Sequence, residues 1–392
     1  MEWTTYHHPM KLEENRMSEV SFKPVGLDRG RLAALMQNRK LDGLFLSSPE
    51  NVFYASGYPC LPGSGNPIIH ALRNQNPYFA FAGCDGQIIL LCWGPAAMGI
   101  DYGADDTRMS FTSQMAADDL VALIDEKFKP GCTVGVESTF PYYALRLLEE
   151  HARPANIQVI DDLLIQLRLI KSPAEIELIR KSTEIIDQTL MELAQNLRLG
   201  MGRLELIREA KRRMLQNGAD GVDHVTAAFG MANPEVALDE PLERDQIVTL
   251  DLGAIYQGYV SDNRRLVYTG KVPETLNKLH QQLCWVVAEM GKALVPGRTF
   301  AEVHAYAYEL FAKVGIDPMF LHVGHSLGLQ VEECWIMSDD PTPVQSGMVL
   351  NIELYAPSQE GLMIGDEETF HITETGTEQL STLPVEIIEK NI

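Results

Sequence analysis

Apolar positions follow different patterns in the two parts of the chain. Before residue 165, short apolar runs typical of buried strands alternate with stretches of helical periodicity. The apolar runs lie at 44–46, 87–93, 133–136 and 157–160, and the helical stretches at 28–38, 117–128 and 142–151. Strands that alternate with helices predict an α/β domain with a mostly parallel or mixed sheet.

A strong helix start marks the boundary to the second part. Ser172 is placed to cap a helix, Pro173 takes the first helical position, and Glu175 completes a capping box. We expect this helix to run from Pro173 to about Leu197 and to end at Gly200. The resulting domains are a loosely ordered polar extension over 1–24, an N-terminal domain over 25–165 and a C-terminal domain over 166–392.

The C-terminal domain follows one plan twice. The first pass predicts helices at 173–197 and 204–217, then strands near 223–229, 246–255 and 259–268. The second pass predicts helices at 274–293 and 300–314, then strands near 326–331, 348–356 and 363–373. This duplicated helix–helix–strand–strand unit indicates an α+β domain.

Charge and cysteine usage exclude several classes of partner. Acidic residues outnumber basic ones by 54 to 32, which gives a formal charge of −22. Nucleic acids and anionic membranes need cationic partners, so we expect neither. The six cysteines show no C-x-x-C spacing, and we expect reduced core thiols. Residues 1–17 contain no apolar stretch typical of a signal peptide, and no run reaches the ~18 apolar residues of a membrane span. We therefore expect a cytoplasmic protein.

Two aspartates stand out on the predicted strands. Alternation along 246–255 places Asp251 on the face opposite Val248 and Leu250. Asp262 follows 11 residues later on the returning strand, so a hairpin could bring the two carboxylates side by side. Adjacent carboxylates repel each other, and a metal ion is their natural partner. For this pair alone, surface aspartates at a strand end are an equal alternative.

Three more candidate ligands stand in or beside apolar strands. They are His325, Glu353 and Glu367. An oxygen-rich site with one imidazole suits manganese, iron, cobalt or zinc, and manganese most naturally.

These segments resemble the pita-bread metallopeptidase family, which includes prolidase, aminopeptidase P, methionine aminopeptidase and the non-peptidase creatinase. The matching phrases are Asp251-Leu-Gly-Ala, Gly258-Tyr-Val-Ser-Asp262, Gly324-His-Ser-Leu-Gly-Leu329, Gly347-Met-Val and Glu367-Glu-Thr. Leu167–Glu175 is similar to the linker of prolidases, and Asn51–Gly57 to their N-terminal domain. The resemblance implies a C-terminal pita-bread domain, the duplicated ααββ fold, preceded by a creatinase-type α/β N-terminal domain.

The same resemblance implies a set of roles. Two divalent metal ions, manganese first and zinc, cobalt or iron as alternatives, would be bound by Asp251, Asp262, His325, Glu353 and Glu367. Asp251 would bind one ion through both oxygens, and Asp262 and Glu367 would bridge the two. Water activated between the ions would be the nucleophile, and Glu353 would transfer its proton. Glu353 and His325 are thus the catalytic candidates. The N-terminal domain type implies a homodimer.

The departures from the family pattern all concern the substrate. Prolidases and aminopeptidases carry a His ahead of the first metal Asp, in a stretch that here reads Asn233–Leu238. Glu332 stands seven residues after His325 in place of another His. Gly365 replaces a substrate-binding Arg two residues before Glu367.

Two neighbouring arginines differ in how they fit the family. Arg264 replaces the usual Thr, whereas Arg265 matches the family Arg. An ionised Glu332 has no proton to donate, but it could accept a hydrogen bond from a substrate amine, face a substrate cation, or pair with Arg264. His322 is either a pocket residue or a structural one. Glu332, His322, Arg264 and Arg265 are the substrate-binding candidates.

Three functions are compatible with these residues. The first is a dinuclear metal-dependent hydrolase of a small peptide or amide, similar to Xaa-Pro dipeptidases and aminopeptidases but with an altered pocket. The second is a non-peptidase enzyme for a cationic or N-substituted metabolite, similar to creatinase, ectoine hydrolase or a dimethylsulfoniopropionate lyase. The third is a silent binding module, which the complete ligand set disfavours. We prefer the first.

Overall fold

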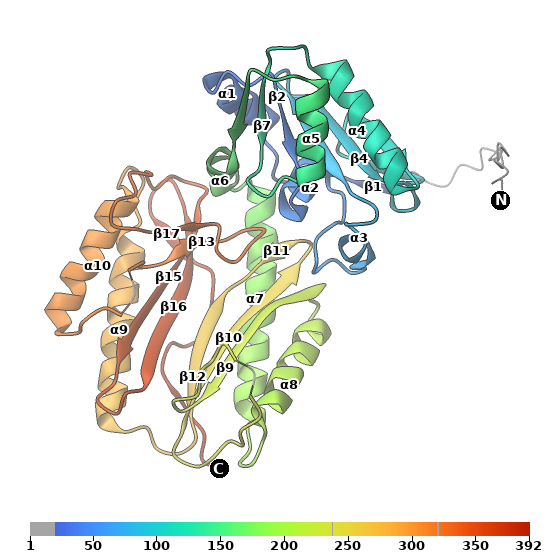
Figure 1. The fold of residues 1–392 in the computed structure, drawn as a ribbon. Helices are drawn as coiled ribbons and strands as arrows, with labels where there is room; N and C mark the ends of the chain where they lie inside the picture. The colour runs from blue at the N-terminus through green and yellow to red at the C-terminus, as the bar shows by residue number, and fades with distance from the viewer. Residues whose placement is uncertain (1–19, 237, 320) are drawn as a thin grey trace, which may run out of the picture.

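The computed structural model describes residues 20–236, 238–319 and 321–392, which form two domains joined at one end (Figure 1). The predicted polar extension over 1–24 lies mostly outside these residues. Its last part is ordered, because β1 (Val20–Phe22) pairs in parallel with β5 (Ile100–Tyr102).

The N-terminal domain is built on the mixed sheet that the pattern predicts. Its six strands lie in the order β6 (Asp106–Ser110), β4 (Ile88–Trp93), β3 (Phe79–Gly83), β2 (Gly43–Leu46), β7 (Thr133–Val136) and β8 (Asn156–Val159). Only β3 runs antiparallel to its neighbours. The sequence pattern missed β3 and β6.

Helices cover both faces of this sheet. On one face, Phe45 and Phe81 pack with Leu120 of α4 (Ser113–Lys127) and Leu148 of α5 (Tyr142–His151). The other face packs with α1 (Arg29–Asn38), α2 (Pro49–Ser56) and α6 (Asp161–Leu169). The short α3 (Ile68–Ala71) and a 3-10 turn at Gly94–Ala96 lie in the connections.

The C-terminal domain shows the duplicated plan. The first pass comprises α7 (Pro173–Asn196), α8 (Arg203–Gln216), β9 (Gly221–Phe229), β10 (Ile247–Tyr256), β11 (Tyr259–Val260) and β12 (Asn263–Tyr268). The second comprises α9 (Glu274–Ala293), α10 (Phe300–Val314), β13 (His325–Ser326), β14 (Cys334–Trp335), β15 (Val349–Pro357) and β16 (Met363–Ile372). The short β17 (Thr377–Gln379) and β18 (Ile388–Glu389) extend the two sheets.

Each pass puts its helices on the outer side of its own sheet (Figure 1). The capping box predicted at Ser172 and Glu175 is present at the start of α7. In the first pass, Val248 and Leu250 of β10 pack with α7 and α8, while Asp251 points away from that core, as alternation predicts. In the second pass, β15 and β16 pack with α9 and α10.

Two predicted strands are shorter than expected. Pairing in 326–331 is limited to β13, because the chain then turns and the Leu329 N–H donates to the Glu333 carboxylate at 3.0 Å. The predicted strand 259–268 is interrupted before Asp262. There the Ser261 hydroxyl accepts a hydrogen bond from the Ala254 N–H at 3.2 Å.

The link between the domains carries buried ion pairs. Helix α6 spans the boundary predicted at residue 165, and the non-helical link to α7 is 170–172. Arg168 and Lys171 both contact Glu333, with Lys171 Nζ 3.0 Å from Glu333 Oε2. All three side chains are buried. These pairs tie the link to the segment that follows β13, which contains His325.

Candidate metal centre

The two β-hairpins of the C-terminal domain carry the acidic residues. Glu353 on β15 lies directly opposite Glu367 on β16. Asp251 on β10 lies opposite Arg264 on β12, and Asp262 immediately precedes β12. The hairpins meet where the Thr369 hydroxyl donates to the Asp262 carbonyl oxygen at 3.1 Å. The pairing of four separate strands therefore brings four carboxylates together.

All five residues predicted as metal ligands lie in this cluster. One group of close donor atoms comes from Asp262, His325 and Glu367, and another from Asp251, Glu353 and Glu367. Within each group the atoms lie within 4.8 Å of one another. His325 Nε2 is 3.5 Å from Asp262 Oδ2 and 3.9 Å from Glu353 Oε2.

The cluster has more negative charge than the surrounding protein offsets. Burial and then the neighbouring carboxylates raise the pKa of Glu367 well above its usual value. Burial also raises the pKa of Glu353. Glu367 is fully buried, and among the described residues its Oε2 has no hydrogen-bond partner. Buried anions of this kind call for a cation, so the residues fit a divalent metal ion.

Three residues that the sequence analysis did not single out also contact the cluster. His224 on β9 lies 3.1 Å from Asp251 Oδ1 and 3.3 Å from Asp262 Oδ1 through its Nε2. Asn351 Nδ2 donates to Glu367 Oε1, and the Tyr355 hydroxyl donates to Glu353 Oε1. Alternation along 348–356 already places Asn351 and Tyr355 on the face of Glu353, which was an available signal. The position of His224 depends on the pairing of β9 with β10, which no local pattern reports.

Arg264 contacts the acidic cluster itself and does not pair with Glu332. Its Nη2 contacts Asp251 Oδ2 and lies 3.3 Å from Glu353 Oε1, so the suggested pairing with Glu332 is wrong. The guanidinium stacks over Tyr355 at 4.3 Å. A Cβ at position 365 would collide with Arg264 Nη1 and with the Tyr355 ring, so Gly365 makes room for this arrangement. Although burial alone would raise the pKa of Asp251, Arg264 and His224 hold it well below the usual value.

The other substrate-binding candidates lie at different depths. Glu332 is exposed, and partial desolvation followed by the field of Asp262 raises its pKa. His322 packs on Trp335 with ring centroids 4.2 Å apart, and burial followed by His325 lowers its pKa to about 4. Arg265 is buried and bonds to Glu368 at 2.6 Å.

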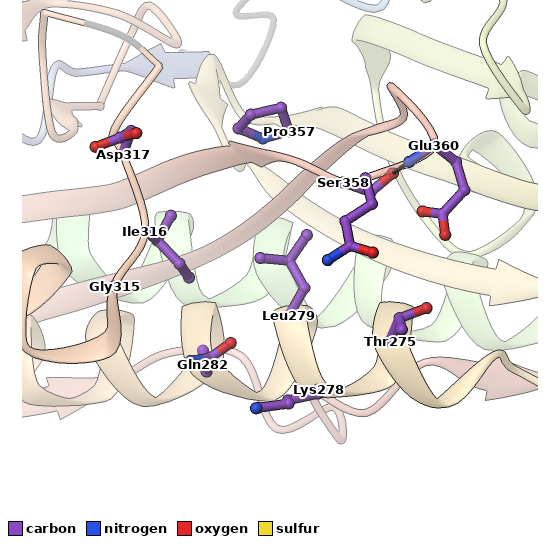
Figure 2. A pocket seen from close by; sticks show the side chains of 11 residues that line it. Thr275, Lys278, Leu279, Gln282, Gly315, Ile316, Asp317, Pro357, Ser358 and Glu360 are labelled. Carbon is purple, nitrogen blue, oxygen red and sulfur yellow. Dashed lines mark hydrogen bonds between the residues drawn. The ribbon is translucent and has the colours of Figure 1, made fainter.

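Hollows on the protein surface differ in their relation to the cluster. One hollow lies between α9 and the turn that joins β15 to β16, and Figure 2 shows that Leu279, Ile316 and Pro357 contribute apolar surface to it. It contains none of the cluster residues. Another hollow has a lining that includes Thr226, the segment 230–235, Arg264, Tyr355 and Gly365. This second hollow reaches the cluster through Arg264 and is the candidate substrate pocket.

Comparisons with known proteins agree with this architecture. The creatinase/prolidase N-terminal domain model matches residues 29–170, and the metallopeptidase family M24 model matches residues 177–374. A Xaa-Pro dipeptidase of Pyrococcus horikoshii is 32% identical over 91% of this chain and 97% of its own length. A Xaa-Pro dipeptidase of Pyrococcus furiosus is 28% identical over 91% of this chain and 98% of its own length. The crystal structure of the prolidase from Pyrococcus horikoshii OT3 superposes with a TM-score of 0.77 over 92% of this chain and 99% of that chain, at 24% identity.

The fold and the acidic cluster together define a two-domain metallohydrolase with a pita-bread domain and a creatinase-type N-terminal domain. The chain belongs to metallopeptidase family M24. Among the described residues, no helix is both long enough and apolar enough to cross a membrane.

Proposed function

We propose that the protein is an Xaa-Pro dipeptidase or aminopeptidase-like hydrolase that uses two divalent metal ions, with manganese first and zinc, cobalt or iron as alternatives. The observation that carries this proposal is the complete set of Asp251, Asp262, His325, Glu353 and Glu367 in one buried cluster. The relatives named Xaa-Pro dipeptidase match over nine-tenths of the chain, which supports the same substrate class.

The ions, when bound, would lower the pKa of a water molecule to roughly 7 and offset the negative charge of the reacting carbonyl oxygen. Glu353 is the group placed to accept a proton, because burial raises its pKa and so makes the carboxylate a stronger base. The Tyr355 hydroxyl and Arg264 both hold Glu353 Oε1, which leaves Oε2 to face His325. Asn351 orients Glu367 in the same way.

Glu332 and His322 do not line the candidate substrate pocket, but besides desolvation the charges of Asp262 and of Glu235, which lines that pocket, raise the pKa of Glu332. We propose that the exposed carboxylate of Glu332 receives the amino group of a short peptide, because that group is cationic at neutral pH. Arg265 has no place in this proposal, since its bonds go to Asn263, Glu368, Ser381 and backbone oxygens. A homodimer and a cytoplasmic location stay predictions.

The test is a turnover screen of metal-loaded protein against Xaa-Pro dipeptides and Xaa-Pro-Xaa tripeptides. Glu353→Gln serves as the blank, because it keeps the shape and removes the base. We expect hydrolysis by the wild type and none by the variant. Protein that holds its metal but cleaves no peptide would contradict the proposal.

A second candidate function rests on Glu332 alone. A carboxylate in place of a proton donor also suits a cationic or N-substituted metabolite as substrate. Turnover of such a metabolite by a protein that cleaves no peptide would favour this non-peptidase reaction.

A further inference from the structure

His224 is held with one ring nitrogen directed at the acidic cluster. It lies on β9 opposite Gly253 of β10, at the point where the pairing register shifts. A Cβ at position 253 would lie 2.5 Å from His224 Cε1 and Nδ1 and 2.9 Å from the Ser261 carbonyl oxygen. Only glycine at position 253 therefore leaves room for the imidazole beside the cluster.

The other ring nitrogen of His224 is already engaged. Nδ1 lies 3.0 Å from Asp223 Oδ2, which can accept a hydrogen bond from the Nδ1–H group. Imidazoles that bind metals generally donate their second N–H to a carboxylate in this way, which fixes the tautomer and the ring orientation. In the metal-free chain, burial alone would lower the pKa of His224, but Asp262, Asp223 and Asp251 outweigh it and hold the pKa well above the usual value, so a proton on Nε2 faces Asp251 Oδ1 and Asp262 Oδ1. A metal ion that displaces this proton would meet three donor atoms, Nε2 and one oxygen of each carboxylate.

Arg264 supplies a reason for an added nitrogen donor. Its Nη2 donates a hydrogen bond to Asp251 Oδ2, which leaves Oδ1 as the oxygen of this carboxylate that is open to an ion. Gly365 and Tyr355 hold the guanidinium in that position. His224 Nε2 lies beside the remaining Oδ1 and can replace the lost oxygen ligand.

We propose that His224 is a sixth metal ligand, which binds one of the two ions through Nε2 together with Asp251 Oδ1 and Asp262 Oδ1. Glu367 gives independent support, because it is fully buried beside these carboxylates and its Oε2 lacks a partner among the described residues. The inference rests on the proposed function only in requiring metal ions at the cluster. His224 Nε2 lies near Asp262 Oδ1 and His325 Nε2 near Asp262 Oδ2, so the two imidazoles face different oxygens of this carboxylate.

This ligand set has a consequence for metal choice. Imidazole suits zinc and iron, whereas carboxylate oxygens suit manganese. Manganese, named first in the proposed function, is therefore expected to bind less tightly at the His224 position than it would at a position made of oxygen ligands alone.

The experiment titrates cobalt(II) into the metal-free full-length chain and follows heat release and the visible absorption of cobalt. We expect two ions per wild-type chain. His224→Ala and the bulkier His224→Gln should each bind one ion as tightly as the wild type does. The second ion should bind at least about 10²-fold more weakly, and the visible absorption band of cobalt should change. Asp223→Asn should weaken the same ion by about 10- to 100-fold, because it only orients the ring.

His151→Ala is the matched control, since this histidine pairs with Asp125 on the N-terminal domain and should leave both ions unaffected. Circular dichroism of each metal-free variant establishes that it folds. Two ions bound with unchanged affinity by both His224 variants would overturn the inference, as would a single ion bound by the wild type. Metal binding is measured without substrate, so a protein that behaves as expected here but cleaves no peptide contradicts the proposed function alone.

Discussion

Two clusters of buried charge lie at the two ends of the segment from His325 to Glu333, and they differ in charge balance. At the domain link, the single carboxylate of Glu333 meets two cations, Arg168 and Lys171. At the metal centre, four carboxylates crowd around one fixed cation, Arg264. Buried charge is tolerated where each group contacts an opposite charge, and a surplus of buried anions needs a further cation to offset it. The cluster at the link, where every charge contacts an opposite one, is the matched cluster. The cluster at the metal centre, where Glu367 Oε2 has no partner among the described residues, is the unmatched one.

The largest expected effect comes from a change in the unmatched cluster. Glu367→Gln should lower peptide turnover by about 10³-fold or more, because it removes a ligand and weakens the charge that stabilises the reaction. The same change should stabilise the metal-free protein by about 1 kcal/mol or more, since a buried anion disappears. Turnover assays and urea unfolding of metal-free protein measure the two effects. A metal-free variant that is less stable than the wild type would show that the buried Glu367 carboxylate does not destabilise the metal-free fold.

At the domain link, we expect a substitution to lower stability and to leave metal binding unchanged. Glu333→Ala leaves Arg168 and Lys171 buried without a counter-charge and should lower the free energy of unfolding by about 3–5 kcal/mol. The metal content of the folded variant should equal that of the wild type. Denaturant unfolding and metal analysis test this, with Glu332→Ala as the exposed neighbouring control. Loss of metal from folded Glu333→Ala would mean that the two clusters are coupled.

Low pH should weaken the ion pairs of Glu333 at the domain link and so lower the stability of the fold. Burial alone would raise the pKa of Glu333, but Arg168 and Lys171 outweigh it and lower the pKa to about 2. A depressed folded-state pKa stabilises the fold above the unfolded value of about 4.5, and this stability is lost as the pH falls toward 2. The difference corresponds to on the order of 3 kcal/mol. Unfolding of metal-free protein between pH 5 and 2 measures the slope, which Glu333→Gln should flatten. An unchanged slope would assign the acid sensitivity to other groups.

Removal of metal should destabilise only the unmatched cluster. Metal at 100 times its dissociation constant adds about 2.7 kcal/mol to stability, so chelation should lower the Tm by several degrees and abolish turnover. Return of the ion should restore both. Full activity after chelation and dialysis would contradict a metal-dependent reaction.

The smallest effect is expected at the exposed rim. Glu332→Gln should change stability by no more than about 0.5 kcal/mol, because the side chain is exposed. If Glu332 receives the substrate amine, KM should rise by about 10-fold while kcat changes little. Steady-state kinetics with peptides that carry a free or an acetylated amine test this, since only the free amine should respond.

The sequence by itself predicted most helices and strands of the C-terminal domain, although it missed β3 and β6 of the N-terminal domain. The spacing of apolar residues predicts the helix–helix–strand–strand plan twice. The helix start is predicted by three nearby residues, Ser172, Pro173 and Glu175. The five residues predicted as ligands could be singled out because each stands in or beside an apolar strand, where a lone polar residue is conspicuous, and the structure brings all five into one cluster.

Only the tertiary structure decided which side chains meet at the metal centre. His224 looks like an ordinary strand residue until β9 pairs with β10 opposite Gly253. The placement of Arg264 depends on Tyr355 and Gly365, which lie about a hundred residues further along the chain. The register between strands sets these contacts, and register follows from the packing of both hairpins, which a local pattern does not contain.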